Sequence, residues 1–248
     1  MSVLSYICDY GSESETSDCD IELSTSRTKL PAPDLSRVPV AISETHVDDP
    51  ELHGGRIRSF SHVRGNWATL VYIKYTADTL QRLTEKLEKE LLNHNKSWQK
   101  CENVHISLSK TVVLNYHLIT PFTKLLQKAV TEFESFELGF DGVKVYCNEE
   151  NTRTFIALQV DYFSQRYFLQ LTTKVDEILT EFKLPTFYED PSFHMSIFWI
   201  NGNYKSEASN IIKELDAIVK CEVGKSLTTV VIDCINCKSG NKHFQYYF

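Results

Sequence analysis

Along residues 53–248 the apolar positions repeat with two different spacings. Leucines between residues 78 and 93 recur every three or four positions, which places them on one face of a helix. Residues 67–73 instead form a short run rich in β-branched and aromatic side chains, which is typical of a strand. Applied to the whole region, these patterns predict strands at 67–73, 103–109, 136–147, 154–160, 193–200, 227–235 and 242–247, and helices at 78–93, 122–133, 168–182 and 208–219.

The predicted elements repeat once along the chain. Each half supplies a strand, a helix, a strand that contains His-x-Ser, a second helix and further strands. Every such element has an apolar face that must be buried against another element. The repeat therefore predicts an α+β fold with two pseudo-symmetric lobes. Their antiparallel sheets are expected to face one another, flanked by helices, with an active-site cleft between them.

The acidity of the chain is confined to its first part. The net charge is −7, yet residues 1–51 contain 11 acidic and 3 basic side chains, and the remainder contains 22 acidic and 23 basic ones. Residues 1–52 are also rich in Ser and Thr and lack a periodic pattern, so we expect a disordered tail followed by one two-lobed domain at 53–248. The near-neutral domain does not indicate bulk nucleic-acid binding, but it suits an enzyme that binds a few nucleotides.

Composition also bears on compartment and cofactors. The sequence has no run of 18 apolar residues and no secretory signal, so we expect an intracellular protein that does not span a membrane. Its seven cysteines are then expected to be reduced thiols. Cys234-x-x-Cys237 resembles half of a zinc site or a redox pair, but structural zinc needs four ligands and no second pair follows. We expect no metal and no cofactor.

The candidate chemistry lies in the two His-x-Ser motifs. Alternate residues of a strand share a face, so His105 and Ser107 point to one side, about 7 Å apart along the strand, and His194 and Ser196 do the same. Ser109 is expected on the side of His105 as well. One such motif arises readily by chance, and a lone strand histidine is usually structural. Two motifs at matching places in two similar halves favour catalysis.

Two imidazoles and two hydroxyls suit attack at phosphorus. Imidazole titrates near neutral pH, so one ring can accept a proton while the other donates one. Serine hydroxyls can donate hydrogen bonds to the non-bridging phosphate oxygens, on which charge develops in the transition state.

At this point the residues resemble those of a known family. His105-Ile-Ser107 and His194-Met-Ser196 in a two-lobed chain resemble the paired signatures of the 2H phosphoesterases. Residues 188–196, Tyr-Glu-Asp-Pro-Ser-Phe-His-Met-Ser, are similar to the branch of that family that trims U6 small nuclear RNA. Residues 55–60, 64–69 and 152–156 also resemble that branch, and the resemblance covers roughly residues 54–248.

The resemblance implies a metal-independent 3′→5′ exoribonuclease that shortens the uridine-rich 3′ end of a single-stranded small nuclear RNA. The penultimate 2′-hydroxyl would attack the adjoining phosphate and leave a 2′,3′-cyclic phosphate. It further implies a nuclear location, and we expect a monomer. The expected base is His194 and the expected acid is His105, with phosphate held by Ser107 and Ser196. The residues expected to contact a nucleotide are Tyr188, by stacking, together with Ser192 and Glu149.

Two alternatives stay open on the sequence. Another 2H activity, such as opening 2′,3′-cyclic phosphates or joining RNA ends, would use the same four side chains. A non-catalytic RNA-binding module of the same fold would use none of them for chemistry.

Overall fold

The computed structural model describes residues 49–51, 55, 60, 62–75, 79–94, 97–222 and 230–248. The predicted disordered tail lies outside this part of the chain except for residues 49–51, and so does most of the 55–60 stretch. Within the described residues, no helix combines the length and the apolar character needed to cross a membrane.

The helices and strands follow the predicted order. The predicted strand at 136–147 is divided at Gly139, and the one at 227–235 is divided at Asp233. Two short strands and a 3₁₀ turn were not predicted, because each has four residues or fewer and shows no clear period. The elements are β1 (Asn66–Lys74), α1 (Thr79–Leu92), β2 (Gln99–Lys100), β3 (His105–Ser107), β4 (Val112–Asn115), η2 (Tyr116–Leu118), α2 (Ile119–Val130), β5 (Phe136–Leu138), β6 (Phe140–Cys147), β7 (Arg153–Val160), α3 (Tyr162–Glu181), β8 (His194–Asn201), α4 (Lys205–Glu222), β9 (Val230–Ile232), β10 (Cys234–Ser239) and β11 (Lys242–Tyr247).

The α+β class and the two groups of antiparallel strands are as predicted, but the two sheets are joined. One nine-stranded sheet runs in the order β11-β10-β1-β3-β8-β7-β6, with β4 paired to β1 and β2 paired to β8. The junction is the pairing of β3 with β8. Along one edge, β3 pairs with β1 of its own lobe and β8 pairs with β7 of its own lobe. The backbone N–H and C=O groups on the other edge of each strand also need hydrogen-bond partners when they are buried. Pairing the two free edges satisfies both.

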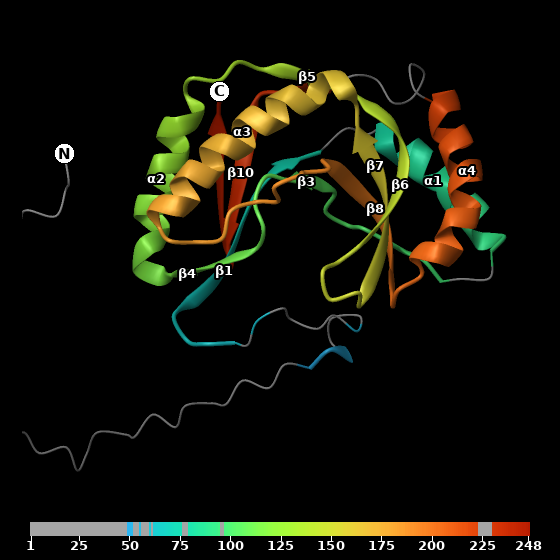
Figure 1. Cartoon of the computed structure of the whole chain (residues 1–248), viewed down its shortest axis with the longest axis horizontal. Coiled ribbons are helices and arrows are strands. Elements are labelled where there is room, and N and C mark those ends of the chain that lie inside the picture. Colours follow the sequence, from blue (N-terminus) through green and yellow to red (C-terminus); the bar gives the residue numbers. More distant parts are fainter. Residues whose placement is uncertain are drawn as a thin grey trace, which may run out of the picture. The chain divides into compact units, whose positions relative to one another are not determined.

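The helices exchange between the two halves of the sequence. In Figure 1, α2 and α3 lie beside β1 and β10, whereas α1 and α4 lie beside β6, β7 and β8. Contacts agree with this view, because α1 packs on α4 and α2 packs on α3. Phe122 of α2, for example, meets Phe182 at the end of α3 edge to face, with ring centroids 5.4 Å apart. Since each half supplies helices to both lobes, the halves share a single core.

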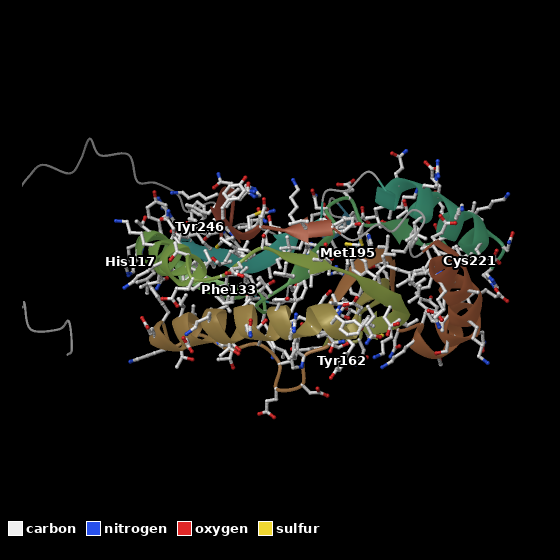
Figure 2. The ribbon with its side chains drawn as sticks, turned by 90° about the horizontal axis from the view of Figure 1, so that it is seen from above. His117, Phe133, Tyr162, Met195, Cys221 and Tyr246 are labelled. Carbon is white, nitrogen blue, oxygen red and sulfur yellow. The ribbon has the colours of Figure 1, made fainter. Side chains whose placement is uncertain are left out.

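The core reaches through the junction of the two lobes. Met195 of β8 lies near the middle of the body in Figure 2, between the helices of the two lobes. Its side chain and that of Ile106 on β3 are fully buried. The sequence alternation around both residues therefore fixes which face of the junction is core and which face carries the histidines.

Candidate active site

The two His-x-Ser segments lie on neighbouring antiparallel strands. Ile106 of β3 is directly opposite Met195 of β8. Because both side chains enter the core, the residues immediately before and after each of them point to the other face. The separate halves of the sequence thus contribute their motifs to one continuous patch of sheet.

Four motif side chains form a square on that face. In an antiparallel pair with this register, His105 lies beside Ser196, and Ser107 lies beside His194. Residues directly opposite have Cβ atoms about 4.5–5.5 Å apart, and diagonal positions are about 7–8 Å apart. The two histidines occupy one diagonal and the two serines the other. A phosphate group bound over the centre would have an imidazole and a hydroxyl on each side.

Each imidazole is held in the same tautomer by a carbonyl of its own chain. The Nδ1 atom of His105 is 2.9 Å from the carbonyl oxygen of Asn103, and the Nδ1 atom of His194 is 2.7 Å from that of Ser192. A carbonyl oxygen only accepts hydrogen bonds, so Nδ1 carries the proton in both rings. In both histidines Nε2 is left as the nitrogen that can exchange a proton with a substrate.

The two histidines differ in their surroundings. The Tyr146 ring is stacked on His194, with centroids 3.7 Å apart and planes 12° apart, and its hydroxyl lies 2.8 Å from Ser192 Oγ. His105 meets only the edge of Tyr72, with centroids 5.3 Å apart. Stacking excludes water from one face of the His194 ring.

Burial lowers the pKa of His194 below the ordinary imidazole value of 6.5. The hydrogen bond to the Ser192 carbonyl raises this pKa, and the positive charges of His105 and Lys144 lower it further, since like charge disfavours the protonated ring. The net direction is downward. A lowered pKa keeps His194 neutral near pH 7, which is the state a general base requires.

The hydroxyls of Ser107 and Ser196 are available. Both residues are half-buried, and no hydrogen bond from either hydroxyl to a described residue is present. Ser109 differs from the expectation, because β3 ends at Ser107. The Ser109 side chain is buried, and its hydroxyl accepts a hydrogen bond of 2.9 Å from the backbone N–H of Val71. Ser109 therefore has a structural role and is not one of the four side chains of the square.

The three residues that were predicted to contact a nucleotide lie in two separate groups. Ser192 is bonded to Tyr146 beside His194, as described above. Tyr188 and Glu149 gather with Lys110, whose Nζ lies 3.3 Å from the Glu149 carboxylate and 4.3 Å from the centroid of the Tyr188 ring. Tyr188 is 46% exposed, so part of its side chain is accessible to a ligand. Burial, followed by the charge of Glu149 and a hydrogen bond to it, raises the pKa of the Tyr188 hydroxyl.

Sequence reasoning missed Tyr72, Lys110, Lys144 and Tyr146. Lys144 and Tyr146 are alternate residues of β6 and so share a face, which was a usable signal. Which strand they would meet depended on sheet order, and no local pattern gives that order. Tyr72 is placed by its register opposite Ser107. Lys110 follows the first motif by three residues and becomes relevant only through contacts with Tyr188 and Glu149.

The cysteine pair does not form half of a metal site. Cys234 and Cys237 are three residues apart on β10, so their side chains point to opposite faces of the sheet. Cys237 is fully buried, and burial raises the pKa of its thiol to about 12.

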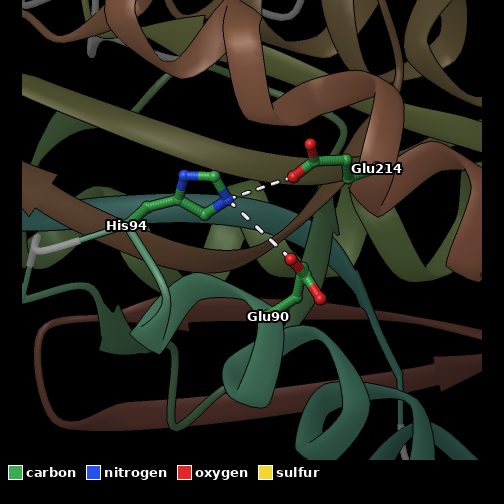
Figure 3. Close-up of side chains that lie close together, drawn as sticks. All are labelled: Glu90, His94 and Glu214. Carbon is green, nitrogen blue, oxygen red and sulfur yellow. Dashed lines mark hydrogen bonds and ion pairs between the residues drawn. The ribbon is translucent and has the colours of Figure 1, made fainter.

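A second histidine cluster joins the helices of one lobe. His94, just after α1, has its Nε2 atom 3.1 Å from Glu214 of α4 and 3.8 Å from Glu90 of α1 (Figure 3). Among the described residues this is the one group with the spacing of a metal site. The three side chains are partly exposed and pair with one another across the α1–α4 contact. Such surface ion pairs contribute about 0–1 kcal/mol to stability.

Known proteins resemble this chain over most of its length. The family named HVSL, described as an uncharacterised conserved protein, matches residues 29–246. U6 snRNA phosphodiesterase 1 of Bos taurus is 42% identical over 224 residues, covering 87% of this chain and 83% of the bovine protein. The Drosophila melanogaster protein of the same name is 34% identical over 258 residues, covering 97% of this chain and 98% of its own length.

The fold has a solved counterpart. Usb1 of Kluyveromyces marxianus superposes with a TM-score of 0.53 at 13% identity, over 75% of this chain and 99% of the yeast one. The yeast likeness shows the fold, and the animal relatives show the family. The chain therefore belongs to the HVSL family and to the family of the U6 snRNA phosphodiesterase 1 proteins.

Proposed function

We propose that this chain is a metal-independent 3′→5′ exoribonuclease that trims the uridine-rich 3′ end of U6 small nuclear RNA. The observation that carries the proposal is the paired anchoring of His105 and His194, which leaves two Nε2 atoms free on one face of the sheet beside two unbonded serine hydroxyls. The substrate follows from the relatives, which are named for phosphodiesterase action on U6 snRNA.

The reaction is a transfer within the RNA. The Nε2 atom of His194 takes the proton of the penultimate 2′-hydroxyl, and the resulting oxygen attacks the adjoining phosphorus. The bond to the 5′-oxygen of the terminal nucleoside breaks, and His105 Nε2 donates a proton to that oxygen. A 2′,3′-cyclic phosphate remains on the shortened RNA, a nucleoside is released, and the two histidines regain their starting states by exchanging protons with water.

The serines stabilise the charge that the reaction creates. Ser107 and Ser196 occupy the other diagonal of the square, so their hydroxyls can donate hydrogen bonds to the two non-bridging phosphate oxygens. Removing one preorganised donor of this kind typically costs about 10²–10³-fold in rate. Since imidazoles supply both proton transfers, the proposed mechanism needs no metal ion.

One chain supplies every group in this mechanism, so we propose that the enzyme acts as a monomer. We place the activity in the nucleus, because the RNA in the relatives' names is a small nuclear RNA.

A short oligouridylate labelled at its 5′ end tests the proposal. We expect a ladder that shortens from the 3′ end, unchanged by EDTA, and mass analysis should find a 2′,3′-cyclic phosphate on the products. His105→Ala and His194→Ala should each abolish the ladder, as should deoxyribose at the penultimate position. Loss of activity in EDTA would overturn the metal-independent mechanism. An intact oligonucleotide beside rapid opening of a cyclic-phosphate end would favour the alternative 2H activity instead.

A further inference from the structure

A polar cavity opens on the same face of the sheet, against Tyr72 and Lys74 of β1. It has a volume of about 520 Å³, within the usual range of about 300–1,000 Å³ for small-molecule sites. The side chains that matter here are Tyr72, Lys74, Cys234, Asn236, Gln245 and Tyr247. Neither the proposed mechanism nor the family resemblance assigns a catalytic or binding role to these residues.

The strand register connects this cavity to the square formed by the two His-x-Ser motifs. Tyr72 of β1 is opposite Ser107 on one side and opposite Asn236 of β10 on the other, and Asn236 is opposite Gln245 of β11. Residues opposite one another in a sheet share a face, and neighbouring strands are about 4.8 Å apart. A row of polar side chains therefore leads from the phosphate-binding Ser107 directly into the cavity.

Asn236 is the strongest sign of a ligand. Its residue is only 9% exposed, it lines the cavity, and no hydrogen bond joins its side-chain amide to a described residue. The amide atoms are not sealed from solvent, so their donor and acceptor are open to a ligand in the cavity. An amide presents a donor and an acceptor side by side, which matches the hydrogen-bonding edge of a nucleobase.

The neighbouring side chains fit a base and its sugar better than a phosphate. Gln245 Nε2 donates to Tyr247 Oη at 3.0 Å and to Cys234 Sγ at 3.2 Å, which leaves its carbonyl oxygen as a free acceptor. Tyr247 is 62% exposed and offers an aromatic face for stacking. Lys74 and Asp233 both line the cavity, so the charge around it is balanced.

The cavity and Tyr188 lie on different sides of the square. The cavity lies across β1 from β3, because Tyr72 and Lys74 in its wall are opposite Ser107 and His105. The Tyr188 ring contacts Lys110, which follows the end of β3 by three residues. A phosphate bound at the square between them would have one nucleoside on each side.

We propose that this cavity binds the nucleoside attached to the scissile phosphate on the His105 side, opposite the nucleoside that stacks on Tyr188. This inference rests on the proposed function and deepens it, because it places both nucleosides that flank the cleaved bond. Amides and an aromatic ring then recognise a base directly next to the bond that breaks.

Binding of an uncleavable RNA tests the placement without requiring activity. The probe is a fluorescein-labelled oligouridylate with deoxyribose at the penultimate position, prepared intact, without the terminal base, or without the penultimate base. Its affinity is measured by anisotropy for the full chain and for the variants Asn236→Ala, Gln245→Ala and Tyr247→Ala. Tyr162→Ala is the matched control, since Tyr162 is 81% exposed on α3, outside the cavity.

We expect the cavity variants to weaken binding of the intact probe about tenfold, in line with the usual contribution of a stacked or paired base. Removing the base at one of the two positions, and only one, should cancel that loss. The cancelling position also identifies which nucleoside His105 serves. Losses that persist on both base-deleted probes, or equal losses in Tyr162→Ala, overturn the inference.

Gln245 is exposed, so its variant remains informative even if Asn236→Ala unfolds. Cleavage of the all-ribose parent is measured in parallel. A wild-type protein that binds the probes as expected but does not cut the parent refutes the proposed function and leaves the cavity assignment standing.

Discussion

At the scale of single residues, the two histidines have identical anchoring but unequal surroundings, and the mechanism we propose gives them different roles. Both rings bond through Nδ1 to the carbonyl two residues earlier, which fixes the same reactive nitrogen in each. Only His194 has an aromatic ring stacked on its face. The sequence motifs are symmetric, so the direction of proton transfer has to come from neighbours such as Tyr146 and Lys144.

The pH profile of kcat/KM should report this asymmetry. A general base works when neutral, so activity should fall as His194 becomes protonated, with the acidic limb below the ordinary imidazole pKa of 6.5. Lys144→Met removes a positive charge that disfavours the protonated ring, so the pKa of His194 should rise and the acidic limb should move to higher pH.

Lys174→Met is the matched control for this change. Lys174 lies on α3, and its ammonium group is paired with Glu177 at 3.0 Å. Its variant should leave the acidic limb where it is in the wild type. An unmoved limb in Lys144→Met, or a shift toward lower pH, would contradict the assignment of His194 as the base.

Tyr188 offers a second test at this scale. Stacking needs the ring but not the hydroxyl, so Tyr188→Phe should keep kcat/KM on oligouridylate within about threefold, whereas Tyr188→Ala should lower it about tenfold or more. If the Phe variant is as impaired as the Ala variant, the hydroxyl and its bond to Glu149 matter more than the aromatic face.

At the scale of elements, the short pairing of β3 with β8 holds the two His-x-Ser motifs side by side. Truncating Ile106 or Met195 to Ala leaves a cavity at the junction and should lower the free energy of unfolding by about 2–5 kcal/mol. Denaturant titration measures this loss. Val231→Ala on β9 is the control, since that side chain is 60% exposed and its removal should change stability by about 0.5 kcal/mol or less.

The elements themselves could be predicted from the sequence, but their partners could not. Apolar spacing located all four α-helices of the described residues and both motif strands, because the positions that enter the core repeat locally. The expected separate sheets were joined instead, since the pairing of Ile106 with Met195 links residues far apart in sequence. Lys110 and Asn236 were missed for the same reason: their significance depends on contacts made by distant strands and loops.

At the scale of the whole molecule, the folded part has few charges to spare for RNA. Residues 52–248 contain 22 acidic and 23 basic side chains, so the composition does not by itself indicate a broad basic surface. Three lysines border the site: Lys74 beside His105, Lys110 beside Tyr188, and Lys144 close enough to lower the pKa of His194. Affinity should then depend on stacking and hydrogen bonds at a few nucleotides more than on the charge of a long RNA backbone.

Salt dependence measures this balance. Each phosphate neutralised on single-stranded RNA contributes a slope of about −0.7 to the logarithm of affinity against the logarithm of salt concentration. Three lysines therefore predict a slope of about −2 for the uncleavable oligouridylate, and each single Lys→Met change at these positions should make it shallower by about 0.7. A slope near −5 would mean that the RNA contacts basic groups well beyond the site, so that recognition extends along the chain and not only around the scissile bond.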